Sequence, residues 1–134
     1  MKFTKITDSV KKRNLEKARR GENIARSYLQ SRGYDIIEQN YRTRYGEIDL
    51  IAGHRGILVF IEVRSRQSEQ FGSPEATINR NKINKLIRNA RSYMSRKRYD
   101  RSYRIDAVCI VLGEGKEPER INHYKNVTFY FKNK

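Results

Sequence analysis

Two almost wholly apolar segments lie next to each other in the chain, and each contains an acid between its apolar residues. They span residues 47–52 and 57–64, and the four residues between them, Gly-His-Arg-Gly, form a link short enough for a hairpin. Strands that are apolar on both faces need other elements packed on both sides of their sheet. The chain is therefore predicted to contain a sheet that is covered by helices.

The same kind of pattern extends over the rest of the chain. Apolar residues at helical spacing predict a helix over residues 10–32 that stops at Gly33, and these residues are Leu15, Ala18, Ala25 and Leu29. A second helix is predicted over residues 77–98, after a surface loop at 65–76. Strands are expected at residues 34–42, 47–52, 57–64, 103–112 and 127–131. This order, αβββαββ, predicts an α/β fold in which two main helices flank a mixed sheet of about five strands. The length of 134 residues fits a single domain.

Basic residues outnumber acidic ones by thirty to fifteen, which gives a formal net charge of +15 at pH 7. Residues 80–104 alone carry ten basic groups and one acid, whereas residues 33–79 carry more acids than bases. A surplus of this size predicts an acidic partner, and nucleic acid is the first candidate. The residues expected to contact it are Arg42, Arg44, Arg66, Lys82, Lys85, Arg88, Arg91 and Arg96. The alternative for those on the second helix is an ordinary solvated helix face.

Other classes of protein are disfavoured by what the chain lacks. No apolar run approaches the roughly 18 residues needed to cross a bilayer, and residues 1–10 contain no apolar segment of the secretory kind, so a cytoplasmic protein without membrane contact is expected. The one cysteine, Cys109, lies in an apolar stretch and is predicted to be a core residue. Tyr41, Tyr45 and Phe71 are also expected to pack rather than to stack on bases.

Three acids occupy positions where apolar residues are expected. Glu22 falls between Ala18 and Ala25 on the apolar stripe of the first helix, so it points towards the sheet. The alternative is that Glu22 lies at the edge of the stripe and extends to solvent or pairs with an arginine. Asp49 and Glu62 interrupt the two apolar strands, and a hairpin register that keeps like faces together puts Glu62 beside Asp49 or beside Glu47. Two or three carboxylates are therefore predicted to converge.

Ionised carboxylates that converge in a partly buried site need a cation, a basic side chain or a shared proton. A hard divalent ion such as Mg²⁺ resolves this conflict best, because it binds one or two carboxylates and takes further oxygen ligands from water or a substrate phosphate. The alternative is a set of structural ion pairs in which Asp49 and Glu62 are satisfied by arginines, and the candidates are Arg42, Arg44, Arg64 and Arg66.

Several motifs in the chain resemble those of the YraN family of uncharacterised bacterial proteins. The most specific is Gly-Glu-Ile-Asp-Leu-Ile at residues 46–51, followed by Phe-Ile-Glu-Val at residues 60–63. Gly21-Glu22, Gly33-Tyr34 and Asn40-Tyr41-Arg42 also match. The resemblance runs from about Gly21 to Val111, so a basic leader at about 1–12 and a tail at about 113–134 lie outside it.

The YraN family is similar in fold to archaeal Holliday-junction resolvases and other restriction-endonuclease-like nucleases. This resemblance implies an active site formed by a helix Glu, a strand Asp and a Glu-x-Lys, which correspond here to Glu22, Asp49 and Glu62. This chain has Arg64 where that motif has lysine. An arginine stays protonated near neutral pH, so it can stabilise charge but cannot activate a water by losing a proton. Lys82 on the second helix is a candidate to supply the missing amine.

The combined prediction is an endonuclease that depends on Mg²⁺ or Mn²⁺ and acts on DNA more readily than on RNA. Asp49 and Glu62 are expected to bind the metal, Glu22 to orient a water or a second ion, and Arg64 to contact the scissile phosphate. The main alternative is a DNA- or RNA-binding module of the same fold with little or no catalysis. A ribosome-associated or RNA-packing protein is a third reading that rests on charge alone. The likeness to junction resolvases also implies a homodimer.

Overall fold

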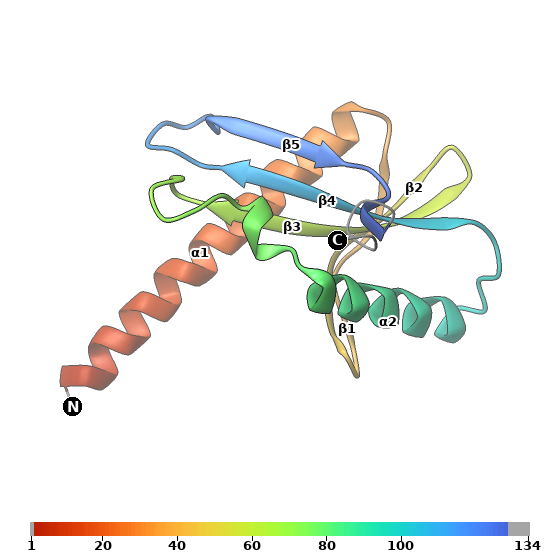
Figure 1. Cartoon of the computed structure of the whole chain (residues 1–134), viewed down its shortest axis with the longest axis horizontal. Coiled ribbons are helices and arrows are strands. Elements are labelled where there is room, and N and C mark those ends of the chain that lie inside the picture. The colour runs from red at the N-terminus through yellow and green to blue at the C-terminus, as the bar shows by residue number, and fades with distance from the viewer. Residues whose placement is uncertain (1, 129–134) are drawn as a thin grey trace.

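A five-stranded mixed sheet forms the centre of the protein in a computed structural model, which describes residues 2–128 and their side chains from residue 8 onwards (Figure 1). Its strands lie in chain order, and only β3 and β4 run parallel to each other. They are β1 (Asp35–Thr43), β2 (Gly46–His54), β3 (Ile57–Arg66), β4 (Tyr103–Val111) and β5 (Arg120–Tyr124). The predicted α/β fold and its element order are confirmed.

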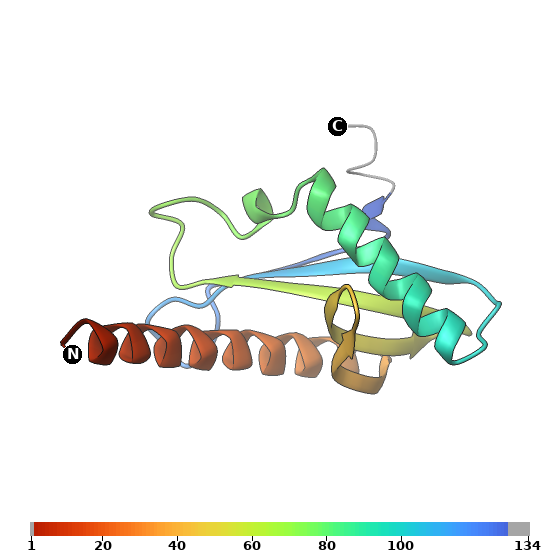
Figure 2. The same cartoon turned by 90° about the horizontal axis from the view of Figure 1, so that it is seen from below.

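Two long helices cover the sheet from opposite sides, as Figure 2 shows. The first, α1 (Lys2–Ser31), buries Ala25 and Leu29 against one face of the sheet. The second, α2 (Arg80–Arg96), packs on the other face through Ile83, Leu86, Ala90 and Tyr93. Each apolar strand is thus buried on both faces, as its sequence requires. Within the described residues, neither helix combines the length and the apolar character needed to cross a membrane.

The first half of α1 extends beyond the sheet (Figures 1 and 2), and the side chains of residues 8–19 are exposed. The prediction that Leu15 faces the core is therefore wrong: its exposed fraction is 51%, because no strand lies beneath it. The helix also begins earlier than predicted and takes in the basic leader from Lys2. It ends as predicted, since Gly33 adopts a positive φ of 85° and the Tyr34 amide returns to the Leu29 carbonyl.

The start of α2 lies later than the sequence predicts. Residues 75–77 form a separate 3₁₀ turn, η1 (Glu75–Thr77), after which Ile78 is extended and buried. Asn79 then caps α2, because its side-chain oxygen accepts a hydrogen bond of 2.9 Å from the Lys82 amide. The cap fixes the first turn of the helix, and with it the position of Lys82.

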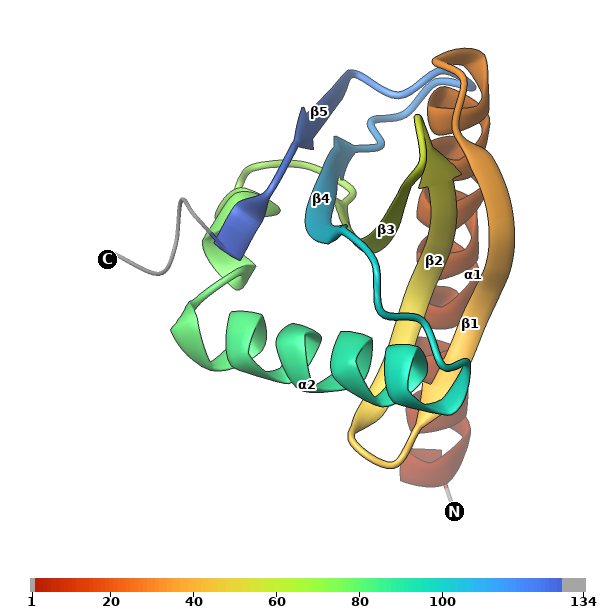
Figure 3. The ribbon, with the colours of Figure 1, turned by 90° about the vertical axis from the view of Figure 1, so that its right-hand side faces the viewer.

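The β1–β2 hairpin lies beside α2, as Figure 3 shows. Thr43 donates a hydrogen bond from its hydroxyl to the Asn89 side chain, and the Tyr41 and Tyr93 rings meet edge to face at 4.9 Å. The packing predicted for Tyr41 is confirmed, as is the burial of Cys109 within β4. The same prediction is wrong for Tyr45 and Phe71, whose exposed fractions are 46% and 85%, because both lie in exposed loops.

The last strand lies elsewhere than predicted. Val127 and Thr128 are helical in conformation, residues 129–131 lie outside the described part of the chain, and the fifth strand is β5. The sequence of β5 is mostly polar, so it has no apolar pattern that would predict a strand. Its polar side chains have partners on distant elements instead. His123 contacts the fully buried Asp106 at 2.7 Å, and Arg120 pairs with Glu75 at 2.6 Å. A strand of this kind is stabilised by tertiary hydrogen bonds rather than by apolar burial.

Candidate active site

Asp49 lies at the point where β2 separates from β3. Pairing between the two strands ends at Leu50 and Ile61. The Asp49 carboxylate then takes the place of the next strand partner and accepts a hydrogen bond of 2.8 Å from the Val63 amide. Side-chain alternation also breaks here, since Ile48 and Ile51 both pack in the α2-side core. The separation of the strands therefore directs Asp49 into the gap between them.

Glu22 reaches this gap from α1, which passes very close to the end of β3. A Cβ atom on Gly21 would lie 2.7 Å from Ser65 Oγ and 2.9 Å from Ser65 Cβ, so only glycine allows this approach. Asn40 and Gln39 of β1 hydrogen-bond the Glu22 carboxylate. The close crossing and these two amides hold the Glu22 side chain against the sheet, as its place on the helix predicts.

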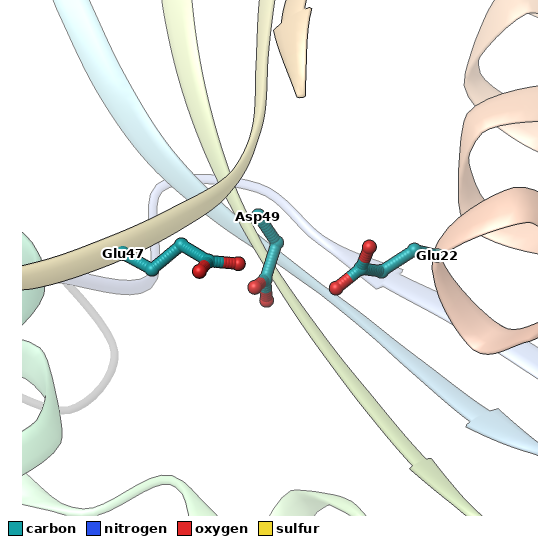
Figure 4. A group of neighbouring side chains, drawn as sticks. All are labelled: Glu22, Glu47 and Asp49. Atoms are coloured by element: carbon teal, nitrogen blue, oxygen red, sulfur yellow. The ribbon is translucent and has the colours of Figure 1, made fainter. Parts of the chain in front are cut away.

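Three carboxylates meet in this gap, as Figure 4 shows: Glu22 from α1 points towards Glu47 and Asp49 from β2. One oxygen of each lies within 4.8 Å of the others. They line a pocket of about 380 Å³ together with Glu62, Val63, Arg64, Ser65, Ala18 and Lys82. Glu47 is absent from the predicted metal ligands, although its position two residues before Asp49 is a signal that could have identified it.

The cluster is electrostatically strained. Burial, together with the nearby Glu62 carboxylate, raises the pKa of Asp49 to about 8. Burial also raises the pKa of Glu22, against the opposing effect of its hydrogen bonds from Asn40 and Gln39. Among the described residues no lysine or arginine pairs with Asp49 or Glu22. Both carboxylates therefore gain from a proton or a cation.

Glu62 has a different environment, because two cations hold it. Its Oε2 atom lies 3.0 Å from Arg64 Nη2 and 3.0 Å from Lys82 Nζ, and its side chain is 5% exposed. The ion-pair alternative thus describes Glu62 but not Asp49. The Arg42 contact to Glu47 is long, at 3.8 Å, and the Arg42 side chain is 89% exposed, so it contributes little.

Two arginines of β3 carry donors without a partner. The Nε atoms of Arg64 and Arg66 are buried and make no hydrogen bond to any described residue. A buried donor of this kind is costly unless a ligand satisfies it. Arg64 also lines the acidic pocket and its side chain is 29% exposed, so its guanidinium can donate to an anionic oxygen there while Nη2 holds Glu62.

The remaining basic residues predicted to bind nucleic acid lie in a second region. Arg44 follows β1, and the side chains of Lys85, Arg88, Arg91 and Arg96 are exposed along α2. Four of these residues, all except Lys85, line one hollow between the β1–β2 hairpin and α2. The structure therefore separates an acidic pocket, where Lys82 and Arg64 lie, from a basic surface next to it.

Comparison with known proteins places these residues in a family. Residues 21–110 match the model of the uncharacterised protein family UPF0102. The chain is 41% identical over 107 residues to a UPF0102 protein of Syntrophomonas wolfei subsp. wolfei, across 79% of this chain and 91% of that protein. It is 37% identical over 115 residues to one from Thermodesulfovibrio yellowstonii, across 86% and 97%. A third, from Syntrophus aciditrophicus, is 42% identical over 101 residues, across 74% and 79%. The chain therefore belongs to the uncharacterised protein family UPF0102, which is the YraN family indicated by its sequence motifs.

Proposed function

We propose that this protein is a metal-dependent endonuclease that hydrolyses phosphodiester bonds in nucleic acid. One observation carries the proposal: carboxylates from α1 and β2 converge within 4.8 Å in a pocket that also holds Arg64 and Lys82. Acids that bind a cation and bases that bind phosphate are the two groups that this chemistry requires. The net charge of +15 provides the attraction for a polyanionic substrate.

The residues present fit a hard divalent ion, Mg²⁺ or Mn²⁺. All three ligand groups are carboxylates, the donors that these ions prefer, and the raised pKa values of Glu22 and Asp49 favour a neutralising cation. Glu22, Glu47 and Asp49 would hold it. When bound, such an ion supplies a Lewis acid for the phosphodiester and lowers the pKa of a water. Glu62 lies beside these ligands and orients the two cationic side chains.

The lysine of the usual Glu-x-Lys motif both stabilises charge and transfers a proton. In this chain Arg64 provides the charge and Lys82 transfers the proton. Arg64 lines the pocket with a side chain that is 29% exposed, and its guanidinium contacts a phosphate oxygen and stabilises the charge that develops there. Lys82 carries an ammonium group that can donate a proton to the departing oxygen, which a guanidinium cannot do at neutral pH. Glu62 holds both side chains at 3.0 Å, so it acts as a positioning residue.

The test is a cleavage assay with the full chain. We expect the purified protein to nick or cleave supercoiled or branched DNA with Mg²⁺ or Mn²⁺, and the Asp49→Asn variant to lose at least about a hundredfold in rate. Asp35→Asn is the matched control, because Asp35 is an exposed carboxylate at the start of β1. Equal cleavage rates for the unmodified protein and the Asp49→Asn variant would contradict the proposal that this pocket is the nuclease active site. DNA is tested first, as the resemblance implies, and RNA second.

A binding module without catalysis is the second candidate, and the environment of the acids favours it. Arg64 and Lys82 neutralise Glu62, and the raised pKa of Asp49 favours its protonated form, so the pocket is partly neutralised without a metal. If about seven phosphates are contacted on duplex DNA, the logarithm of affinity falls against the logarithm of salt with a slope of about −6. The same slope in EDTA, with no cleavage of any substrate, would favour this module.

Assembly and location remain predictions from the sequence. A homodimer would supply two acidic pockets for two cuts, and light scattering of the protein with and without DNA measures it. Cell fractionation tests the predicted cytoplasmic location.

A further inference from the structure

A second hollow, separate from the acidic pocket, lies between the β1–β2 hairpin and the outer face of α2. Its volume is about 540 Å³, and it is lined by Arg44, Tyr45, Arg88, Arg91, Ser92, Ser95 and Arg96. No acid lines it, and across residues 8–128 none of the four arginines pairs with a carboxylate. Four like charges gathered in one hollow repel one another, so an anionic ligand stabilises this arrangement.

The hollow is already formed without a ligand, because the hairpin is tied to α2. The Thr43 hydroxyl donates to Asn89, and the Tyr45 amide donates back to Thr43 Oγ1 at 3.0 Å. Gly46 adopts a φ of 139° next to Asn89, a backbone conformation that side chains rarely allow. The hairpin and α2, which lie side by side in Figure 3, are therefore fixed relative to each other. The arginines that they carry are held in place before a ligand binds, which lowers the cost of binding.

The hollow and the acidic pocket share no lining residue, but both lie along the same two elements, the β1–β2 hairpin and α2. On the hairpin, Tyr45 lines the hollow and Glu47 lines the pocket. On α2, Lys82 lines the pocket, Arg88 to Arg96 line the hollow, and exposed Lys85 lies between them. At a rise of about 1.5 Å per residue, the hollow covers roughly 9–21 Å of α2 beyond Lys82.

We propose that this hollow binds phosphates of the same nucleic acid strand that enters the acidic pocket. The inference rests on the proposed function, because that function identifies the ligand as nucleic acid. At about 3.4 Å per phosphate along one strand of a duplex, the hollow meets phosphates about three to six positions from the bond in the pocket. The guanidinium groups make bidentate hydrogen bonds to phosphate oxygens. The hydroxyls of Ser92 and Ser95 donate further hydrogen bonds to the phosphates, and the Tyr45 ring contacts the strand.

The composition of the hollow favours a nucleic acid over an anionic membrane. Every lining side chain except Tyr45 is an arginine or a serine, so the hollow has a single ring and no apolar face to bury in a bilayer. A concave site also suits a strand that passes through it better than a flat surface of headgroups. Binding of anionic lipid is therefore an outcome that the test must be able to reveal.

The first experiment measures binding without cleavage, with Ca²⁺ or EDTA in place of Mg²⁺. We expect Arg88→Ala with Arg91→Ala to weaken binding of a 20-base-pair duplex roughly tenfold and to reduce the salt slope by about 2. The control is Arg32→Ala with Arg101→Ala, which removes the same charge from exposed residues away from the hollow. Equal affinities for the two double variants would overturn the inference, as would loss of binding to vesicles of anionic lipid with duplex binding unchanged.

The second experiment tests the continuity of the strand with single-stranded oligonucleotides of four to twelve nucleotides. With the spacing of a duplex strand, an oligonucleotide must reach about three to six nucleotides beyond the bond in the pocket to occupy both sites, so the affinity of the unmodified chain should rise over that range of lengths. The rise should be absent in the Arg88→Ala, Arg91→Ala variant, and an identical length dependence in both proteins contradicts a shared strand. If cleavage requires Asp49 but is unchanged in the Arg88→Ala, Arg91→Ala variant, this inference is wrong and the proposed endonuclease stands. If that variant loses binding but no protein cleaves any substrate, the endonuclease is wrong and this inference stands.

Discussion

At the scale of single residues, the chemistry of the pocket depends on how Glu62 is shared between two cations. Arg64 and Lys82 approach the same oxygen, each at 3.0 Å, and they come from different elements. A guanidinium cannot transfer a proton at neutral pH, whereas an ammonium can. The departure from the usual Glu-x-Lys therefore leaves proton transfer to a lysine that the helix, rather than the strand, supplies.

Substitution of Lys82 separates these two roles. We predict that Lys82→Ala lowers the cleavage rate about a hundredfold, and that Lys82→Arg, which keeps the charge beside Glu62, fails to restore it, because proton transfer is lost in both. Single-turnover kinetics at saturating DNA measure this effect. Lys12→Ala, on the exposed first half of α1 and away from both the pocket and the hollow, is the control. Full activity of Lys82→Arg would show that Lys82 contributes only its charge.

At the scale of elements, the site exists because α1 crosses β3 closely enough to bring Glu22 to Asp49. The contact that sets this distance is Gly21 against Ser65. A methyl group on residue 21 would meet Ser65 Cβ at 2.9 Å, and a Cβ atom cannot rotate away as Oγ can. The helix would have to move, and Glu22 would move with it.

Gly21→Ala is therefore expected to destabilise the protein by about 1–3 kcal/mol, despite the higher helix propensity of alanine. Cleavage should fall further than the loss of folded protein explains, because Glu22 is displaced. Urea denaturation and rate measurements on the same samples test this. Adding Ser65→Gly should recover most of the loss, and a fully active, fully stable Gly21→Ala protein would exclude the close crossing as the cause.

A second link between elements gives a prediction for pH. Arg120 of β5 holds Glu75 of η1 through two contacts, and Tyr124 donates a third at 2.6 Å. The Arg120 hydrogen bonds hold the pKa of Glu75 at about 2, below its ordinary value of 4.5. The charged form is thus favoured in the folded state, so its contribution is present above about pH 4.5 and is lost as the pH falls towards 2.

Glu75→Gln should therefore lower the free energy of unfolding by about 1–2 kcal/mol at pH 7, since the pair is partly open to solvent. The difference from the unmodified chain should shrink as the pH approaches 2. Urea titrations at a series of pH values give this curve. Glu69→Gln is the control, because Glu69 also contacts Arg120 but is about half exposed. A pH-independent difference would contradict the charge-based explanation.

At the scale of the whole molecule, the spacing of apolar residues predicted the helices, the strands and the acids that interrupt them, because these features depend on nearby residues in the chain. The apolar stripe of α1, the two apolar strand sequences and the short link between them were enough to predict that Glu22, Asp49 and Glu62 lie around one pocket. The role of Glu47 depends on the separation of β2 from β3, which is a tertiary property. The fifth strand was missed for the same reason, because His123 and Arg120 find their partners on β4 and η1.

The distribution of charge completes the whole-molecule description. Acids gather where α1 meets the sheet. The four arginines of the hollow, none of which pairs with a carboxylate in the described part of the chain, gather beside α2. A polyanion attracted by this basic surface is therefore led to an acidic pocket that repels it until a cation binds. Divalent ions and nucleic acid should therefore reinforce each other's binding. This coupling depends on the acid cluster of Glu22, Glu47 and Asp49, because that cluster is the proposed binding site of the ion.

Binding of Mn²⁺ to the full chain tests the proposed metal site most directly. The concentration of free Mn²⁺ is followed by electron paramagnetic resonance. We predict tight binding in the folded protein that weakens at least about tenfold in Asp49→Asn, because one of three carboxylate ligands becomes an amide. Asp49→Asn should keep the circular dichroism of the unmodified chain, since its side-chain oxygen can still accept the Val63 hydrogen bond. Equal Mn²⁺ affinity in the two proteins, or no binding at millimolar Mn²⁺ in either, would contradict a metal site at these acids.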